Sequence, residues 1–118
     1  RDLSVQMFNS INQQRKSAGV KELVWSEAHY NAAVIRANEI VEKFSHTRPN
    51  GKKWTTENQS ILHCENLEKA HSSVESAMNG FMNSSGHKAN ILLSDFSKGG
   101  TAVIEVNKIY YYVQLFGY

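Results

Sequence analysis

The two β-rich runs at the C-terminal end of the chain constrain its fold most strongly. "TAVIEV" (residues 101–106) and "IYYYVQLF" (residues 109–116) consist largely of β-branched and aromatic residues, and only Asn107 and Lys108 separate them. This pattern predicts two strands joined by a two-residue hairpin loop. Because side chains alternate between the faces of a strand, the second run presents apolar or aromatic side chains on both. Such a sheet needs cover on both faces, which favours a three-layer arrangement of helix, sheet and helix.

Two long segments in the first half of the chain have the apolar spacing of helices. Residues 3–18 place apolar side chains about one helical turn apart, and Gly19 follows where a left-handed cap residue is expected. Residues 27–43 carry a broad apolar stripe after Ser26, which is a good N-cap. The tripeptide Pro-Asn-Gly at positions 49–51 then predicts a β-turn.

The middle of the chain is less regular. Residues 52–70 show no clear period, and we expect an irregular connector in which only "ILHC" (residues 61–64) could form a strand. Ser72 and Glu75 have the spacing of a capping box, ahead of a helix that runs to about Asn83. The "SSGHKANIL" that follows predicts a tight corner and one short helical turn.

The totals for the whole chain exclude several classes of protein. With 118 residues the chain suffices for one core but not for two, so residues 1–118 are expected to form a single domain and a monomer. The formal net charge is only +2, which indicates no nucleic-acid partner. No apolar run approaches the roughly 20 residues of a membrane span. The chain begins at Arg1 rather than Met, so any targeting segment is expected outside this sequence.

Cys64 is the only cysteine, and therefore no intrachain disulfide can form. It lies beside the apolar residues Ile61 and Leu62. This setting predicts a small buried hydrophobic side chain rather than a reactive thiol.

Two of the five histidines stand out by position. His29, His63 and His71 lie within or just before expected elements and need no special role. His46 follows the helix expected at residues 27–43, and His87 lies near the start of the next short helical turn. Side chains at such corners can point into a shared site.

Glu57 and Glu65 lie in the least regular segment, and Glu65 directly follows the apolar "ILHC" run. A carboxylate there must be exposed, paired or bound to a ligand, and simple exposure of Glu65 is as good an interpretation as the other two. Two neutral imidazoles and two carboxylates would suit a divalent metal, with zinc the natural choice. The spacing matches no local metal motif, so the residues alone leave this open.

Other chemistry has less support. Ser45 precedes His46 and Ser85 nearly precedes His87, but the chain has no G-x-S-x-G elbow and only two aspartates that could orient a histidine. Neither G-x-G-x-x-G nor a P-loop is present, so nucleotide chemistry is not indicated.

Five motifs occur in order along nearly the whole chain: "FNSINQQRKSAGVKELVW", "FSHTRPNGKKW", "CENL", "GFMNSSGHKANIL" and "YYYVQLFG". Together they resemble the CAP superfamily of cysteine-rich secretory, antigen 5 and pathogenesis-related class 1 proteins, also called the SCP domain. The absence of disulfides is similar to bacterial members. The chain departs from the usual pattern at Ser85, where proline is commoner.

The resemblance implies an α+β fold, an α-β-α sandwich with a small antiparallel sheet, and a central cleft lined by two histidines and two glutamates. His46, His87 and Glu65 match the family motifs, and Glu57 falls where the other glutamate is expected. Family members have been found with a divalent metal, often zinc, on the two histidines. The glutamates are then nearby partners through water.

We therefore expect a secreted or cell-surface binding protein that uses this cleft for a metal and for a small-molecule, lipid or peptide ligand. One alternative is a metal-dependent hydrolase in which Glu65 or Glu57 is the general base. Another is an interaction domain with a vestigial cleft. A shared fold does not fix the chemistry, so the resemblance settles the function less than the fold. Binding is placed before hydrolysis because the sequence shows no feature that would recognise a substrate.

Overall fold

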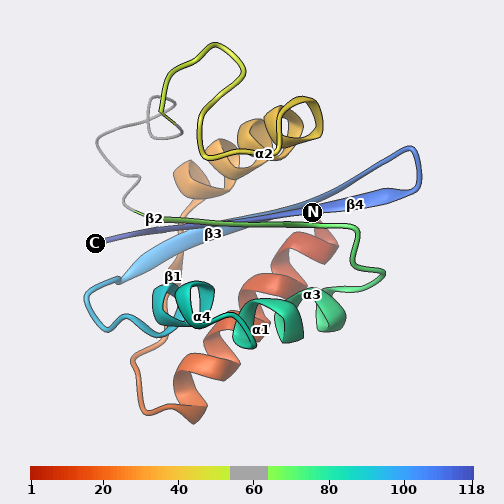
Figure 1. Cartoon of the computed structure of the whole chain (residues 1–118). Coiled ribbons are helices and arrows are strands. Elements are labelled where there is room, and N and C mark those ends of the chain that lie inside the picture. Colours follow the sequence, from red (N-terminus) through yellow and green to blue (C-terminus); the bar gives the residue numbers. More distant parts are fainter. Residues whose placement is uncertain (54–63) are drawn as a thin grey trace.

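The computed structural model describes residues 1–53 and 64–118, which form a four-stranded sheet with helices on both faces (Figure 1). The strand order is β1-β3-β4-β2. β4 pairs antiparallel with both β3 and β2, whereas β1 pairs parallel with β3. The strands are β1 (Val24–Trp25), β2 (Cys64–Lys69), β3 (Lys98–Val106) and β4 (Ile109–Gly117).

The helices divide unequally between the two faces of the sheet. They are α1 (Asp2–Ser17), α2 (Glu27–Glu42), α3 (Val74–Met82) and α4 (Ser85–Leu92). α2 lies alone on one face, and α1, α3 and α4 lie on the other (Figure 1). Each face has its own core: Val113 and Leu115 of β4 pack in the α2 layer, whereas Tyr112 and Phe116 pack with α1 and α3. The predicted three-layer sandwich is confirmed.

The predicted hairpin of β3 and β4 is also confirmed. Asn107 and Lys108 both have positive φ, 53° and 66°, as a type I′ turn requires. This turn has the twist of the strands that it joins, so the register from Lys98↔Gly117 to Val106↔Ile109 is unbroken.

The first two helices lie within two residues of their predicted bounds. Gly19 has a φ of 75° just after α1, and the side chain of Ser26 accepts a hydrogen bond from the His29 amide at the start of α2. The β-turn at 49–51 forms as well, with the Gly51 amide donating to the Arg48 carbonyl. No helix within the described ranges is long and apolar enough to cross a membrane.

The start of α3 differs from the prediction by one residue. The N-cap is Ser73, whose hydroxyl accepts from the Ser76 amide, and not Ser72. Consecutive serines offer two equivalent caps, and the packing of Val74 and Ala77 into the core selects the second.

α4 is a true helix of eight residues rather than one short turn. Ser84 makes no side-chain cap there, so the helix depends on tertiary contacts. Ile91 is fully buried, and the Arg15 guanidinium of α1 donates to the carbonyls of Ile91 and Leu93 at 2.8 and 2.9 Å. These bonds satisfy carbonyls that a helix end otherwise leaves unpaired.

β2 is the main correction to the sequence interpretation. An irregular connector was expected, yet Cys64–Lys69 pairs along its length with β4. Its polar residues obscured the strand pattern, because Glu65 and Asn66 are buried through partners on different helices. β1 was not predicted, since two residues carry no periodicity. Residues 61–63 of the "ILHC" run lie outside the described residues.

Candidate functional site

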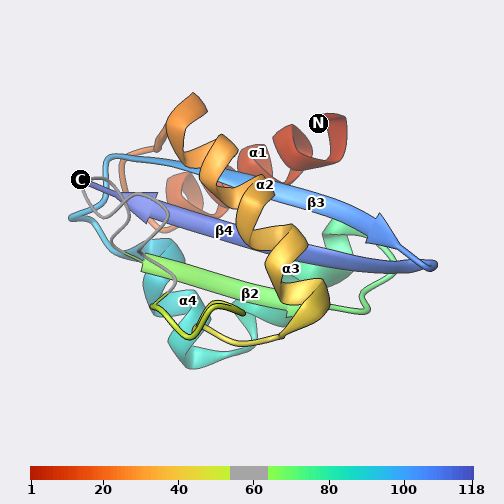
Figure 2. The ribbon, with the colours of Figure 1, turned by 90° about the horizontal axis from the view of Figure 1, so that it is seen from above.

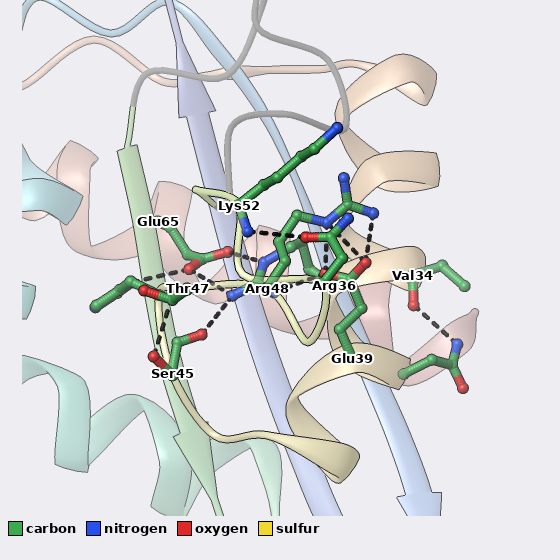
Figure 3. Close-up of polar contacts among 11 residues, drawn as sticks. Val34, Arg36, Glu39, Ser45, Thr47, Arg48, Lys52 and Glu65 are labelled. Carbon is green, nitrogen blue, oxygen red and sulfur yellow. Dashed lines mark hydrogen bonds and ion pairs between the residues drawn. The ribbon is translucent and has the colours of Figure 1, made fainter.

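Glu65 is the buried centre of the candidate site. Its side chain points from β2 toward α2, where Arg36 Nε donates to Oε2 at 2.6 Å and Arg36 Nη2 donates to Oε1 at 3.0 Å (Figure 3). Both side chains are fully buried. The interpretation that Glu65 points to solvent is therefore wrong: this carboxylate is paired, as a buried charge must be.

Arg36 also connects Glu65 to the loop after α2. Its Nη1 donates to Glu39 Oε1 at 2.7 Å and its Nη2 to the Ser45 carbonyl at 2.7 Å. Arg48, in the turn that follows, donates from Nε to Glu39 Oε2 (Figure 3). Burial opposes the charge of Arg36, but its bonds to Glu65 and Glu39 outweigh burial and raise its pKa. Burial likewise opposes the charge of Glu39, yet Arg48 and Arg36 hold its pKa below the usual value.

Sequence reasoning missed this network. The available signal was an arginine and a glutamate three residues apart, Arg36 and Glu39, on the otherwise apolar side of the helix expected at 27–43. Ser45 has a structural role here: its hydroxyl accepts from the Thr47 amide, and its carbonyl accepts from Arg36.

His46 is held by Glu65. Its Nδ1 lies 2.8 Å from Glu65 Oε1, the same oxygen that accepts from Arg36 Nη2. The His46 side chain is 61% exposed, so only the Nδ1 edge is enclosed. A carboxylate can only accept from an imidazole, so the tautomer that fits this contact has its proton on Nδ1, and Nε2 keeps its lone pair in the neutral ring.

His87 is held in a similar way in α4. Its Nδ1 lies 2.9 Å from Ser84 Oγ, and its ring packs edge-on against Phe81 at 5.2 Å. Asn66 of β2 donates to the His87 carbonyl at 3.1 Å and accepts from Asn90 at 2.8 Å, so β2 fixes this helix. Burial lowers the pKa of His87, and the charge of His46 lowers it further. Asn66 is the neighbour of Glu65 on β2, so the residues bonded to His46 and to the His87 carbonyl are adjacent on this strand.

The structure thus brings three of the four predicted residues to one strand edge. The fourth, Glu57, lies outside the described residues. Among residues 1–53 and 64–118, no three His, Cys, Asp or Glu side chains are grouped closely enough to hold a metal ion. The two described cavities lie along α1 and α3 rather than beside His46 and His87.

Other sequence predictions can be compared with the structure. Cys64 is partly rather than fully buried, and burial raises the pKa of its thiol to about 11, the direction expected of an unreactive side chain. His29 is buried beside Ser26. His71 lies between Ser76 Oγ, at 3.0 Å from Nδ1, and Glu68 Oε1, at 3.2 Å from Nε2.

Comparisons with known proteins agree with this fold. An extracellular protein containing an SCP domain from Bacillus anthracis has a TM-score of 0.78 and 24% identity, over 98% of this chain and 40% of that one. An outer surface protein from Borrelia burgdorferi has a TM-score of 0.82 and 19% identity, over 99% and 92%. A cysteine-rich secretory protein from Staphylococcus aureus has a TM-score of 0.71 and 18% identity, over 97% and 38%.

At these identities the neighbours show the fold alone, and the chain spans about two fifths of two of them. A search of curated proteins found no match. A family model described as the cysteine-rich secretory protein family matches residues 8–116, which is nearly the whole sequence. The chain therefore belongs to the cysteine-rich secretory protein (CAP) family.

Proposed function

We propose that this chain is an extracellular or cell-surface binding domain in which His46 and His87 bind a divalent metal, zinc first, through their Nε2 atoms. One observation carries the proposal: each imidazole has its Nδ1 engaged by the protein, by Glu65 or by Ser84. Neither Nε2 has a partner among the described residues. Histidines that ligate metals characteristically donate their other ring N–H to such a group.

The donor set fits zinc, which takes neutral imidazole nitrogens and carboxylate oxygens. Arg36 engages both oxygens of Glu65, so we assign Glu65 the role of orienting His46 rather than direct ligation. We keep Glu57 as the proposed carboxylate partner.

When bound, the metal would supply a positive centre at a partly exposed edge of the protein. A carboxylate or carbonyl oxygen of a small molecule, a lipid or a peptide is the group that such a centre takes. The extracellular and outer-surface neighbours support the location that we propose.

Calorimetric titration with zinc at pH 7.5 tests this proposal. The unmodified chain is expected to bind one zinc ion, and the His46→Ala, His87→Ala double variant to lose at least tenfold in affinity. His71→Gln is the matched control, because His71 is a partly buried histidine with two polar contacts away from this site. A double variant that binds zinc as tightly as the unmodified chain would contradict the proposal.

A further inference from the structure

The turn that follows α2 contains a pair of residues with a chemical reactivity of its own. Asn50 is followed by Gly51, and both residues are exposed. In such a pair the backbone nitrogen of the glycine can attack the side-chain amide of the asparagine, because glycine has no side chain to hinder the approach. The sequence contains one other Asn-Gly pair, Asn79 and Gly80, which lies in α3. The structure places the two pairs in opposite settings.

The side chain of Asn50 is folded back along the chain. Its Oδ1 accepts a hydrogen bond from the Lys52 amide at 2.9 Å. This contact with the amide two residues on is an Asx turn, and it holds Cγ of Asn50 beside the intervening Gly51 peptide. An attack on Cγ places negative charge on Oδ1, and the Lys52 N–H that already donates to this oxygen stabilises that charge.

The nitrogen of Gly51 is open to approach. The φ angle of Gly51 is 85°, and a Cβ there would meet no atom of the described residues within 4 Å. Its N–H donates to the Arg48 carbonyl at 2.9 Å across an exposed turn, where such a bond opens easily. Residues 43–53 carry four basic side chains and no acidic one, and nearby positive charge favours loss of the proton from the attacking nitrogen.

Asn79 and Gly80 form a matched pair that is protected by the fold. Both residues lie inside α3, where side chains tilt toward the N-terminus of the helix and therefore away from the next backbone amide. The helix is also packed closely at Gly80, since a Cβ there would lie 2.6 Å from Glu68 Oε2. The backbone at this pair thus has little room to bend into a ring.

We propose that Asn50 is a site of spontaneous covalent modification, at which the side-chain amide is lost and a mixture of aspartate and isoaspartate forms. The reaction needs only water, so it requires no enzyme and no cofactor. No step involves His46 or His87, and the inference is therefore independent of the metal proposal.

The atoms of the reaction balance without any oxidation or reduction. The Gly51 nitrogen gives its proton to water and forms a bond to Asn50 Cγ. The bond from Cγ to Nδ2 breaks, and the nitrogen leaves as ammonia after taking a proton from water. Water then opens the resulting cyclic imide at one of its two carbonyl carbons. Opening at Cγ gives aspartate, and opening at the main-chain carbonyl carbon gives isoaspartate.

The modification would alter the turn that follows His46. This turn is closed by the Gly51 contact described above and by the Arg48 amide, which donates to the Lys52 carbonyl at 2.7 Å. The imide nitrogen has no proton to donate, and isoaspartate adds one carbon to the main chain inside the turn. We therefore expect modification of Asn50 to loosen this turn.

Peptide mapping by mass spectrometry tests the inference. The folded chain is kept at pH 8, and the conversion of side-chain amide to acid is followed at Asn50 and at Asn79. Asn50 is expected to convert at least tenfold faster than Asn79, because only Asn50 lies in an open turn. In urea, where no helix protects either pair, the two rates should become similar.

Asn50→Gln is the matched control, because its longer side chain forms the corresponding ring far more slowly. Hydrogen exchange of the Arg48 amide is compared before and after the incubation. It should become at least fivefold faster in the unmodified chain and stay the same in Asn50→Gln. The inference is overturned if Asn50 converts no faster than Asn79 in the folded chain, if Asn50 converts only in urea, or if its conversion leaves the exchange of Arg48 unchanged.

Discussion

At the scale of single residues, the site depends on Arg36. This side chain is fully buried and holds two carboxylates and one carbonyl from three segments of the chain. Burying a carboxylate such as Glu65 is favourable only while a matched cation stays beside it. His46 is oriented through Glu65, so Arg36 acts on the histidine without touching it.

Replacing Arg36 with methionine should therefore cost about 3–5 kcal/mol of unfolding free energy, because it leaves Glu65 buried without its cation. Urea unfolding at pH 7 measures the change. Arg1→Met is the control: Arg1 pairs with Glu27 at the exposed surface, and its loss should lower the free energy of unfolding far less than the loss of Arg36. Equal losses of unfolding free energy in the two variants would show that the buried pair contributes no more to stability than the exposed one.

Glu68 gives a second residue-scale prediction. Burial raises the pKa of this carboxyl to about 7, and its buried Oε1 accepts no hydrogen bond from the described residues, although His71 Nε2 lies 3.2 Å away. The folded chain thus favours the protonated acid, and the unfolded chain does not. This contribution to stability is complete below the unfolded pKa and is lost as the pH rises through 7.

The free energy of unfolding should consequently fall by about 2 kcal/mol between pH 5 and pH 8 on account of Glu68. Glu68→Gln should remove that part of the slope and make the protein more stable than the unmodified chain at pH 8. Denaturant titrations across this range provide the measurement. A slope that is unchanged in Glu68→Gln would contradict the assignment.

At the scale of elements, local signals decided which parts could be predicted. The β3–β4 hairpin and the first two helices were predictable, because their turn residues, caps and apolar spacing lie within each segment. β2 was not, since its burial depends on Arg36, 29 residues before Glu65, and on Asn90, 24 residues after Asn66. His46 and His87 entered the candidate site through ordered family motifs, not through their spacing.

α4 provides the element-scale prediction. Arg15 is fully buried, and its guanidinium serves the carbonyls of Ile91, Leu93 and Phe96. Burial disfavours the charged guanidinium of Arg15 and lowers its pKa. The hydrogen bonds to the carbonyls hold the side chain in place despite this burial. Arg15→Leu should leave these carbonyls unpaired and destabilise the protein by about 2–4 kcal/mol.

Hydrogen exchange measured amide by amide in Arg15→Leu should then be faster in α4 than it is in the unmodified chain. The exchange of α2 should change less. Lys16→Leu, an exposed neighbour on the same helix, should not change the exchange of α4. If α4 is equally protected in Arg15→Leu, the helix does not depend on this side chain.

At the scale of the whole molecule, the candidate site lies where the two helical layers meet at one edge of the sheet. β2 is an edge strand of the sheet (Figure 2), and α2 and α4 lie on opposite faces of the sheet (Figure 1). Glu65 and Asn66 are adjacent but face different layers, Glu65 toward Arg36 and Asn66 toward Asn90. The strand thereby positions His46 from one layer and His87 from the other.

Zinc affinity at such a site should decrease as the pH is lowered, because only neutral imidazole binds the metal. An ordinary imidazole gains its proton near pH 6.5, and burial together with the charge of His46 lowers the pKa of His87 below that. Affinity should thus be nearly constant above pH 7 and fall steeply by pH 5. Equal zinc affinity at pH 5 and pH 7.5 would exclude ligation by these histidines.

The most direct test of the central claim is a crystal structure from zinc-containing buffer with anomalous data collected at the zinc edge. The account predicts one strong anomalous peak bonded to Nε2 of both His46 and His87, at about 2.1 Å from each. Glu65 should stay on Arg36 and His46 Nδ1 in that crystal. A peak that avoids either histidine, or no peak at this edge of the sheet, would contradict it.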